Sequence, residues 1–239
     1  MKGMILAAGM GTRLRPLTDN LPKIMLPIAG RPLIDYIVRL FREHDIQDIA
    51  INLHHKPETV REHLGDGQRF GVHVTYSFEE KLLGTAGALG KLRNFFTETF
   101  VAINGDMLSS IDISAQVNFH RSRRATATIA LFEVADPTTR GVVELDGDRR
   151  IRRFVEKPPA DRVFSNLVNA GVYVIEPEVL NYIPDNTFAD LGTDTFPLLL
   201  QAGKRLFGYP SRDYLLDIGT LASYKQAEED VLSGKVKRF

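Results

Sequence analysis

The feature that most constrains the fold is a short apolar run near the start of the chain that ends at a glycine loop. Residues 4–8 carry no polar side chain and are followed by Gly9. A run of this kind, stopped by glycine, is typical of a buried β-strand. Gly9 and Gly11 permit a tight turn in which bare backbone amides come close to a ligand. The sequence therefore predicts a strand followed by a loop that presents its backbone.

Two cations, Arg13 and Lys23, flank this loop and favour an anionic ligand. Backbone N–H groups and fixed positive charge together suit a polyphosphate. The dinucleotide-binding fingerprint is excluded because Leu14 stands where its third glycine is required. A P-loop is excluded because Gly11 is not followed by Lys and then Ser or Thr. The alternative is an ordinary strand-to-helix turn in which Arg13 and Arg15 are solvated.

The next part of the chain alternates between strand and helix patterns. Helices are predicted at residues 33–41 and 57–64, and strands at residues 48–52 and 72–76. This alternation indicates a parallel sheet with right-handed crossovers. Further on, Asp146 and Gly147 separate two strand patterns and predict a hairpin, so the sheet is expected to become mixed.

Two later helices are predicted from their start signals. Thr85 follows Gly84 and can act as the N-cap of an amphipathic helix. A helix is also expected over residues 194–202, with Thr193 or Asp194 as its cap.

Composition narrows the classes of protein further. The chain has 239 residues, 30 acidic and 30 basic, and no cysteine. It can bury one substantial core, and its balanced charge argues against nucleic acid or an anionic membrane as partner. The lack of cysteine excludes disulfides and thiolate metal sites and fits a reducing compartment. No signal peptide or membrane-length apolar run is apparent, so a cytoplasmic protein is expected.

Carboxylates follow two predicted strands. Asp106 comes after the apolar residues 100–103 and Gly105, and Asp217 follows the strand pattern of residues 213–216. The carboxyl ends of strands are where open α/β sheets bind ligands. Magnesium bound to phosphates is held by one or two carboxylates, which makes Mg²⁺ the expected ion at Asp106 if the ligand is a triphosphate. The alternative is that these residues only form turns.

Taken together, these motifs carry a family resemblance. Residues 9–18 and 22–23 closely resemble the signature of sugar-phosphate nucleotidylyltransferases, and four further motifs of that family follow in its order at residues 83–87, 104–106, 156–158 with 169–171, and 216–220. The resemblance covers about residues 2–230. It implies a Rossmann-like three-layer α/β sandwich with a central mixed, mostly parallel sheet, of the nucleotide-diphospho-sugar transferase type. It also implies a short form without the β-helix extension of longer relatives.

The expected organisation is a single domain over residues 1–239. Its nucleotide-binding half covers about residues 1–110 and its sugar-phosphate-binding half about residues 111–230, with a basic tail at residues 235–239. No linker rich in Pro, Gly or Ser separates the halves. Association into a homo-oligomer is left open.

The resemblance implies transfer of a nucleotidyl group from a nucleoside triphosphate to a sugar 1-phosphate, with release of pyrophosphate. The attack is in line and depends on Mg²⁺. The motif at residues 83–87 favours GTP and mannose 1-phosphate. UTP or dTTP with glucose 1-phosphate, and UTP with N-acetylmuramate 1-phosphate, are alternatives. Two other classes stay open: a non-catalytic nucleotide-sugar-binding regulatory subunit, and a cytidylyltransferase with a non-sugar acceptor.

The family motifs also imply which residues form the site. The expected catalytic residues are Arg13, Lys23 and Asp106. The expected nucleotide-binding residues are Leu6, Ala8, Gly9, Gly11, Thr12, Arg13, Lys23, Glu79, Gly84 and Thr85. The expected sugar-phosphate-binding residues are Asp106, Glu156, Lys157, Asn169 and Gly171. Asp106 and Asp217 are the expected metal ligands.

Overall fold

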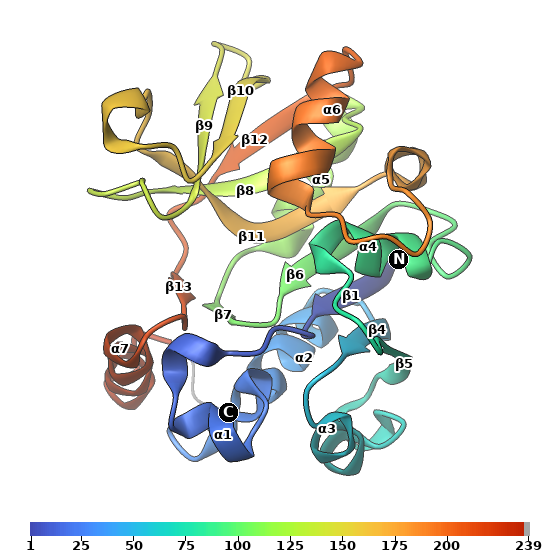
Figure 1. The fold of residues 1–239 in the computed structure, drawn as a ribbon, viewed down its shortest axis with the longest axis vertical. Coiled ribbons are helices and arrows are strands. Elements are labelled where there is room, and N and C mark those ends of the chain that lie inside the picture. Colours follow the sequence, from blue (N-terminus) through green and yellow to red (C-terminus); the bar gives the residue numbers. More distant parts are fainter. Residues whose placement is uncertain (237–239) are drawn as a thin grey trace. The chain divides into compact units, whose positions relative to one another are not determined.

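A computed structural model describes residues 1–236, and the chain divides into two compact units (Figure 1). Unit 1 combines Met1–Leu82, Ile103–Asp112 and the chain from Asp213 onward, and unit 2 combines Leu83–Ala102 and Ile113–Arg212. The units therefore interleave along the sequence, whereas the expected nucleotide and sugar-phosphate halves are contiguous.

Unit 1 is built on three parallel strands: β1 (Lys2–Leu6), β4 (Asp48–Leu53) and β5 (His73–Phe78). Helices α2 (Leu33–Glu43) and α3 (Pro57–Leu64) connect them, which confirms the alternation predicted from the sequence. Five of the six β4 residues are buried, and all of these except Asn52 are apolar, as expected of a parallel strand covered on both faces. The sheet thus holds the end of β1 rigidly at the start of the glycine loop.

Unit 1 also contains 3₁₀ turns, two further helices and four short strands. They are the 3₁₀ turns η1 (Thr12–Leu14), η2 (Lys23–Met25) and η3 (Gln68–Phe70), helices α1 (Leu17–Asn20) and α7 (Leu221–Leu232), and strands β2 (Pro27–Ile28), β3 (Arg31–Pro32), β7 (Met107–Ser109) and β13 (Leu215–Asp217). Strand β6 (Phe100–Asn104) runs across the boundary between the two units. Thr220 caps α7 in a capping box with Ser223.

The basic tail expected at the end of the chain is only partly described. Residues 237–239 lie outside the described residues. Lys235 pairs with Asp230 at 3.3 Å, and Val236 is 3% exposed. Of the first two residues of the expected tail, Lys235 thus forms an ion pair with α7 and Val236 is buried.

Unit 2 contains a mixed set of strands. They are β8 (Ala127–Glu133), β9 (Gly141–Leu145), β10 (Ile151–Glu156), β11 (Leu167–Ile175) and β12 (Leu206–Pro210). The predicted hairpin is confirmed, since β9 and β10 pair antiparallel around residues 146–147. Strand β11 pairs antiparallel with β8 and β9, and β12 pairs parallel with β8. The chain is thus of the expected α/β class, with a central mixed sheet, mostly parallel, flanked by helices.

The helical elements of unit 2 are α4 (Gly84–Lys91), α5 (Ile113–Arg123), α6 (Phe196–Gln201), the 3₁₀ segments η4 (Ala160–Arg162) and η5 (Pro177–Tyr182), and the π-helix η6 (Leu191–Thr195). Two predicted caps are wrong. Leu83, not Thr85, precedes α4, and the Thr85 hydroxyl binds Asp190 instead. The second helix begins earlier, as η6, and its cap is Asp190. At Thr85 a tertiary contact overrides the local signal, whereas the second helix is capped locally, by the bond from the Gly192 amide to Asp190 Oδ1.

Candidate functional site

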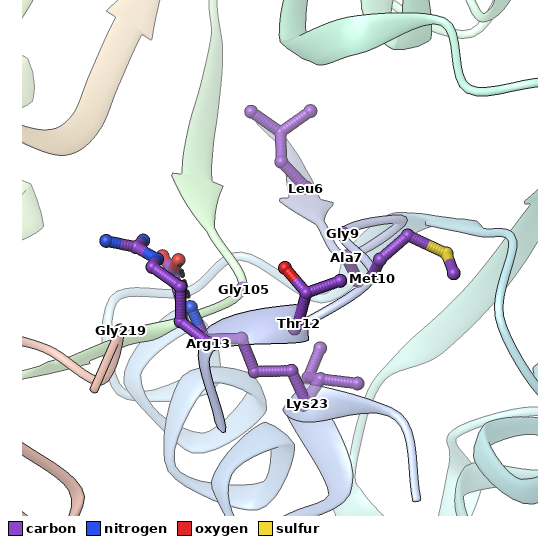
Figure 2. Close-up of a pocket in the computed structure, with 12 residues that line it drawn as sticks. Leu6, Ala7, Gly9, Met10, Thr12, Arg13, Lys23, Gly105 and Gly219 are labelled. Atoms are coloured by element: carbon purple, nitrogen blue, oxygen red, sulfur yellow. Dashed lines mark hydrogen bonds and ion pairs between the residues drawn. The ribbon is translucent and has the colours of Figure 1, made fainter. Parts of the chain in front are cut away.

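The glycine loop of unit 1 borders a cavity of about 260 Å³ (Figure 2). The cavity is lined by Leu6, Ala7, Gly9, Met10, Gly11, Thr12, Arg13, Lys23, Ile24, Gly105, Asp106 and Gly219. These residues come from the end of β1, the loop that follows it, the turn between β6 and β7, and the turn between β13 and α7. All three catalytic residues expected from the sequence therefore line one cavity, at the carboxyl end of a parallel strand.

The loop backbone is held in one conformation at Gly11. Its φ is +62°, and an added Cβ would lie 2.9 Å from Thr18 Cγ2 and 3.2 Å from Lys23 Cβ. The Thr18 hydroxyl donates a 2.8 Å hydrogen bond to the Gly11 carbonyl. Gly9 differs, because no atom lies within 4 Å of an added Cβ there. Gly11 is thus needed for the shape of the loop, and Gly9 leaves open space beside it.

A short ion pair joins two of the expected catalytic residues. Lys23 Nζ donates to Asp106 Oδ2 at 2.6 Å, and the two side chains are 13% and 30% exposed. Gly105 brings Asp106 against β1, since its amide donates to the Leu6 carbonyl at 2.8 Å. The pair therefore balances one cation and one anion at the edge of the cavity.

Backbone pairing places the second expected metal ligand, Asp217, on a strand beside that of Asp106, although Asp217 is not among the residues that line the cavity. Strands β7 and β13 pair antiparallel with Asp217 opposite Met107, and the Ile218 amide donates to the Asp106 carbonyl at 2.8 Å. An added Cβ on Gly219 would lie 3.0 Å from Asp217 Oδ1 and 3.1 Å from Arg13 Nη2. A bare glycine at this position lets the Asp217 carboxylate and the Arg13 guanidinium approach the same point.

The donor set fits a divalent cation that shares its ligands with phosphate. Within residues 1–236, no cluster of three or more His, Cys, Asp or Glu side chains could hold a metal ion. Asp106 and Asp217 supply two hard carboxylate donors. Magnesium is commonly held by one or two carboxylates together with waters and substrate phosphates, so these two residues suit it.

Glu79, an expected nucleotide-binding residue, is buried behind the loop and does not line the cavity. Glu79 is only 1% exposed, and its Oε1 accepts a 2.8 Å hydrogen bond from Asn52 Nδ2. Asn52 Oδ1 in turn accepts from the Ala7 amide at 2.7 Å. This network ties together the ends of β1, β4 and β5. Asn52 was not among the expected site residues, although a polar residue inside an apolar strand pattern is a signal that points to it.

In unit 2, the motif at residues 83–87 packs against a later segment of the chain. Gly84 has φ of +73°, and an added Cβ would collide with the Ala189 carbonyl oxygen. Thr85 Oγ1 donates to Asp190 Oδ2 at 2.9 Å and accepts from the Leu191 amide at 2.8 Å. The Thr85 hydroxyl is thus engaged within the protein, which leaves its backbone for any contact with a nucleotide.

Glu156 and Lys157 lie together at the end of β10. Lys157 Nζ is 3.4 Å from Glu156 Oε1, with the lysine side chain 66% exposed and the glutamate 19%. Burial raises the pKa of Glu156; Lys157 opposes this rise and the Asp190 carboxylate adds to it. Added Cβ atoms on Gly141 and Gly192 would each lie 2.7 Å from Glu156 Oε2. Two bare glycine backbones therefore enclose one oxygen of this carboxylate.

Asn169 and Gly171 lie where strand β11 is irregular. The register with β8 shifts between Asn169 and Tyr173, and Gly171 has φ of +72°. Asn169 Oδ1 accepts from the Gly171 amide at 2.9 Å, and Nδ2 donates to the Tyr173 hydroxyl at 2.9 Å. Both polar ends of Asn169 have partners within unit 2, and one amide hydrogen is left for a ligand.

Curated relatives match along almost the whole chain. A uridylyltransferase acting on UTP and glucose 1-phosphate, from Synechocystis sp., is 40% identical over 99% of this chain and 65% of its own length. A mannose-1-phosphate guanylyltransferase from Mycobacterium tuberculosis is 36% identical over 97% of this chain and 64% of its own length. The chain thus spans about 65% of the length of the Synechocystis relative.

Solved structures agree with these relatives. A Bacillus anthracis chain assigned as a glucose-1-phosphate thymidylyltransferase, solved with sucrose, is 30% identical with a TM-score of 0.89 and covers 100% of this chain and 97% of its own. HddC from Yersinia pseudotuberculosis, solved with GMP-PN, is 25% identical with a TM-score of 0.80, over 96% of this chain and 98% of its own. These similarities confirm the Rossmann-like fold.

Among the described residues, no helix combines the length and apolar character needed to cross a membrane. The family model for nucleotidyl transferases matches residues 2–234, which include every candidate residue described above. The chain belongs to the nucleotidyl transferase family.

Proposed function

We propose that this chain transfers a nucleotidyl group from a nucleoside triphosphate to a sugar 1-phosphate and releases pyrophosphate. The observation that carries this proposal is the cavity of unit 1, where a glycine loop, two cations and Asp106 share one space of about 260 Å³. An anionic ligand with several phosphates matches such a combination of backbone amides and positive charge.

The reaction brings two anions together, so its main requirement is positive charge. An oxygen of the sugar 1-phosphate attacks the α-phosphorus, the bond from that phosphorus to the bridging oxygen of the β-phosphate breaks, and pyrophosphate leaves with the electron pair. Such transfers depend on positioning and charge neutralisation more than on covalent help from the protein. We assign Arg13 to the leaving pyrophosphate and Lys23 to the α-phosphate.

Members of this family generally use a divalent metal ion. We propose that Asp106 and Asp217 hold Mg²⁺, which supplies charge neutralisation at the phosphates. Because Lys23 and Asp106 pair at 2.6 Å, each must exchange this partner when substrates bind. Lys23 turns to a phosphate oxygen, and the Asp106 carboxylate becomes available to the cation.

The sugar 1-phosphate is assigned to residues of unit 2. Lys157 is 66% exposed and can reach a phosphate, and Glu156 can accept hydrogen bonds from sugar hydroxyls. Asn169 retains a donor for the sugar, and Gly171 opens the strand beside it.

The substrate pair is the part of the proposal that most needs an experiment. GTP with mannose 1-phosphate is favoured by the motif at residues 83–87 and by the name of the Mycobacterium relative. UTP with glucose 1-phosphate is supported by the name of the Synechocystis relative. Both substrate pairs would use the same charged residues of the cavity.

The test is a pyrophosphate-release assay with GTP, UTP, dTTP, ATP and CTP, each with mannose 1-phosphate, glucose 1-phosphate or N-acetylmuramate 1-phosphate. We expect release with one pair, only when Mg²⁺ and the sugar 1-phosphate are both present. Chelation with EDTA should stop it, and Mg²⁺ in excess should restore it. Choline phosphate with CTP tests the non-sugar class. Binding of a nucleotide-sugar without turnover of any pair would indicate a regulatory subunit and overturn the proposal.

A further inference from the structure

Asp190 joins two elements of unit 2, α4 and η6, through its carboxylate and its amide. Oδ2 accepts from the Thr85 hydroxyl at 2.9 Å, and Oδ1 accepts from the Gly192 amide at 2.9 Å. The Asp190 amide donates to Asp194 Oδ2 at 2.7 Å. All these contacts lie within unit 2, and none of them was expected from the sequence.

On one side of Asp190, the chain is fastened to the first turn of α4. The Ala189 carbonyl accepts from the amides of Ala86 at 2.9 Å and Gly87 at 3.1 Å, and the Ala189 amide donates to the Leu83 carbonyl at 2.9 Å. An added Cβ on Gly87 would lie 2.6 Å from the Thr187 carbonyl oxygen. The turn at residues 83–87 is therefore shaped by the segment that ends at Asp190.

On the other side, Asp190 sets the position of Gly192, which forms one wall around Glu156. The bond from the Gly192 amide to Asp190 Oδ1 fixes the backbone at this point. An added Cβ on Gly192 would lie 2.7 Å from Glu156 Oε2. A shift of the Gly192 backbone would therefore change the space available to that carboxylate. Burial in these surroundings raises the pKa of Glu156.

We infer that Asp190 is a positioning residue, which holds Glu156 in the orientation that binds the sugar and links it to the turn at residues 83–87. This inference rests on the proposed function, in which Glu156 binds the sugar. Asp190 acts through hydrogen bonds to Thr85 and Gly192 rather than by touching a substrate. The same residue thereby supports one element assigned to the nucleotide and one assigned to the sugar.

The test compares Asp190→Ala with Asp190→Asn. Asparagine keeps an acceptor for the Gly192 amide and offers its amide group to the Thr85 oxygen, whereas alanine removes both contacts. Calorimetry gives two dissociation constants, one for a nucleoside diphosphate and one for the matching nucleotide-sugar. The measurement is the first constant divided by the second. This ratio reports the contribution of the sugar, and a purely structural role would leave it unchanged. Thermal unfolding is followed in parallel.

We expect Asp190→Ala to lower this ratio by about three- to tenfold, the amount set by a hydrogen bond or two, and Asp190→Asn to retain most of it. A second matched pair is Thr85→Val and Thr85→Ser, of which only valine removes the hydroxyl. The double variant Thr85→Val with Asp190→Ala should lose less than the sum of the two single losses, because both act on one network.

An unchanged ratio in Asp190→Ala, with only the melting temperature lowered, would overturn the inference and assign Asp190 a structural role alone. The inference would also be overturned if Asp190→Asn lowered the ratio as much as Asp190→Ala does, because the charge of Asp190 and not its hydrogen-bond geometry would then matter. A wild-type protein that binds no nucleotide-sugar would instead contradict the proposed function itself.

Discussion

Lys23 Nζ donates a 2.6 Å hydrogen bond to Asp106 Oδ2, across 83 positions of the sequence. The lysine side chain is only 13% exposed, so other parts of the protein cover it in addition to the Asp106 carboxylate. Ions that are largely removed from water need a partner. The pair therefore holds both side chains in place until substrates offer each another partner.

We predict that Asp106→Asn lowers the rate of pyrophosphate release by about 10²-fold or more, because it removes a negative charge from the metal-binding set. The fold should persist, since asparagine still accepts a hydrogen bond from Lys23. Steady-state rates at saturating Mg²⁺ and thermal unfolding check the two halves of this expectation. A matched control is Asp112→Asn, a carboxylate of the same unit whose side chain is 57% exposed, near His44. A wild-type rate in Asp106→Asn would remove this residue from the site.

The two loop glycines should respond differently to alanine. Gly11→Ala places a side chain at φ of +62° and 2.9 Å from Thr18 Cγ2, so we expect it to lower the free energy of unfolding. The backbone strain alone should cost about 1–2 kcal/mol. Gly9→Ala meets no atom within 4 Å and should change stability by less than about 0.5 kcal/mol.

Both substitutions should raise the KM for the nucleoside triphosphate, Gly9→Ala because its methyl group enters the cavity and Gly11→Ala because it displaces Lys23. Urea denaturation and initial rates separate the two effects. If Gly9→Ala leaves the KM for every triphosphate unchanged, the loop does not approach the substrate as we propose.

The sequence predicted those parts of the fold and the site that depend on local pattern. Apolar runs define where β1 and β6 end, so the glycine loop and Asp106 could be placed at strand ends from the sequence alone. The contact of Asp190 with Thr85 could not be predicted, because the two residues are 105 positions apart and both carry ordinary turn or cap signals. The same contact explains why Thr85 does not cap α4. The interleaving of the two units likewise depends on pairing between distant segments, which leaves no mark on composition.

Asn52 illustrates a contact that the sequence signalled only weakly, and it yields a prediction about stability. Asn52→Ala removes the donor to Glu79 Oε1 and the acceptor for the Ala7 amide, and should lower the free energy of unfolding by about 1–3 kcal/mol. Asn52→Asp keeps the acceptor but sets a second carboxylate beside Glu79, so near neutral pH it should be less stable still. Urea denaturation of the two variants tests this order. An Asn52→Asp protein more stable than Asn52→Ala would show that Glu79 is not held by this network.

His120 should make stability depend on pH. His120 is only 1% exposed. Its Nδ1 lies 2.9 Å from Thr128 Oγ1, and its Nε2 lies 3.0 Å from Glu176 Oε1. Burial lowers the pKa of His120, and the Glu176 carboxylate opposes this only in part. In the unfolded chain the imidazole titrates near its ordinary pKa of about 6.5.

Below that pH the unfolded chain therefore binds a proton that the folded protein does not, and the folded state loses stability as the pH falls. The loss from this one group is at most about 1.4 kcal/mol per pH unit and is complete only below the folded pKa. We expect the difference in free energy of unfolding between the wild type and His120→Gln to shrink steadily between about pH 7 and pH 5. Substitution of the exposed His73 by Gln provides the control. A difference that stays constant over this range would show that His120 binds its proton as readily in the folded protein as in the unfolded chain.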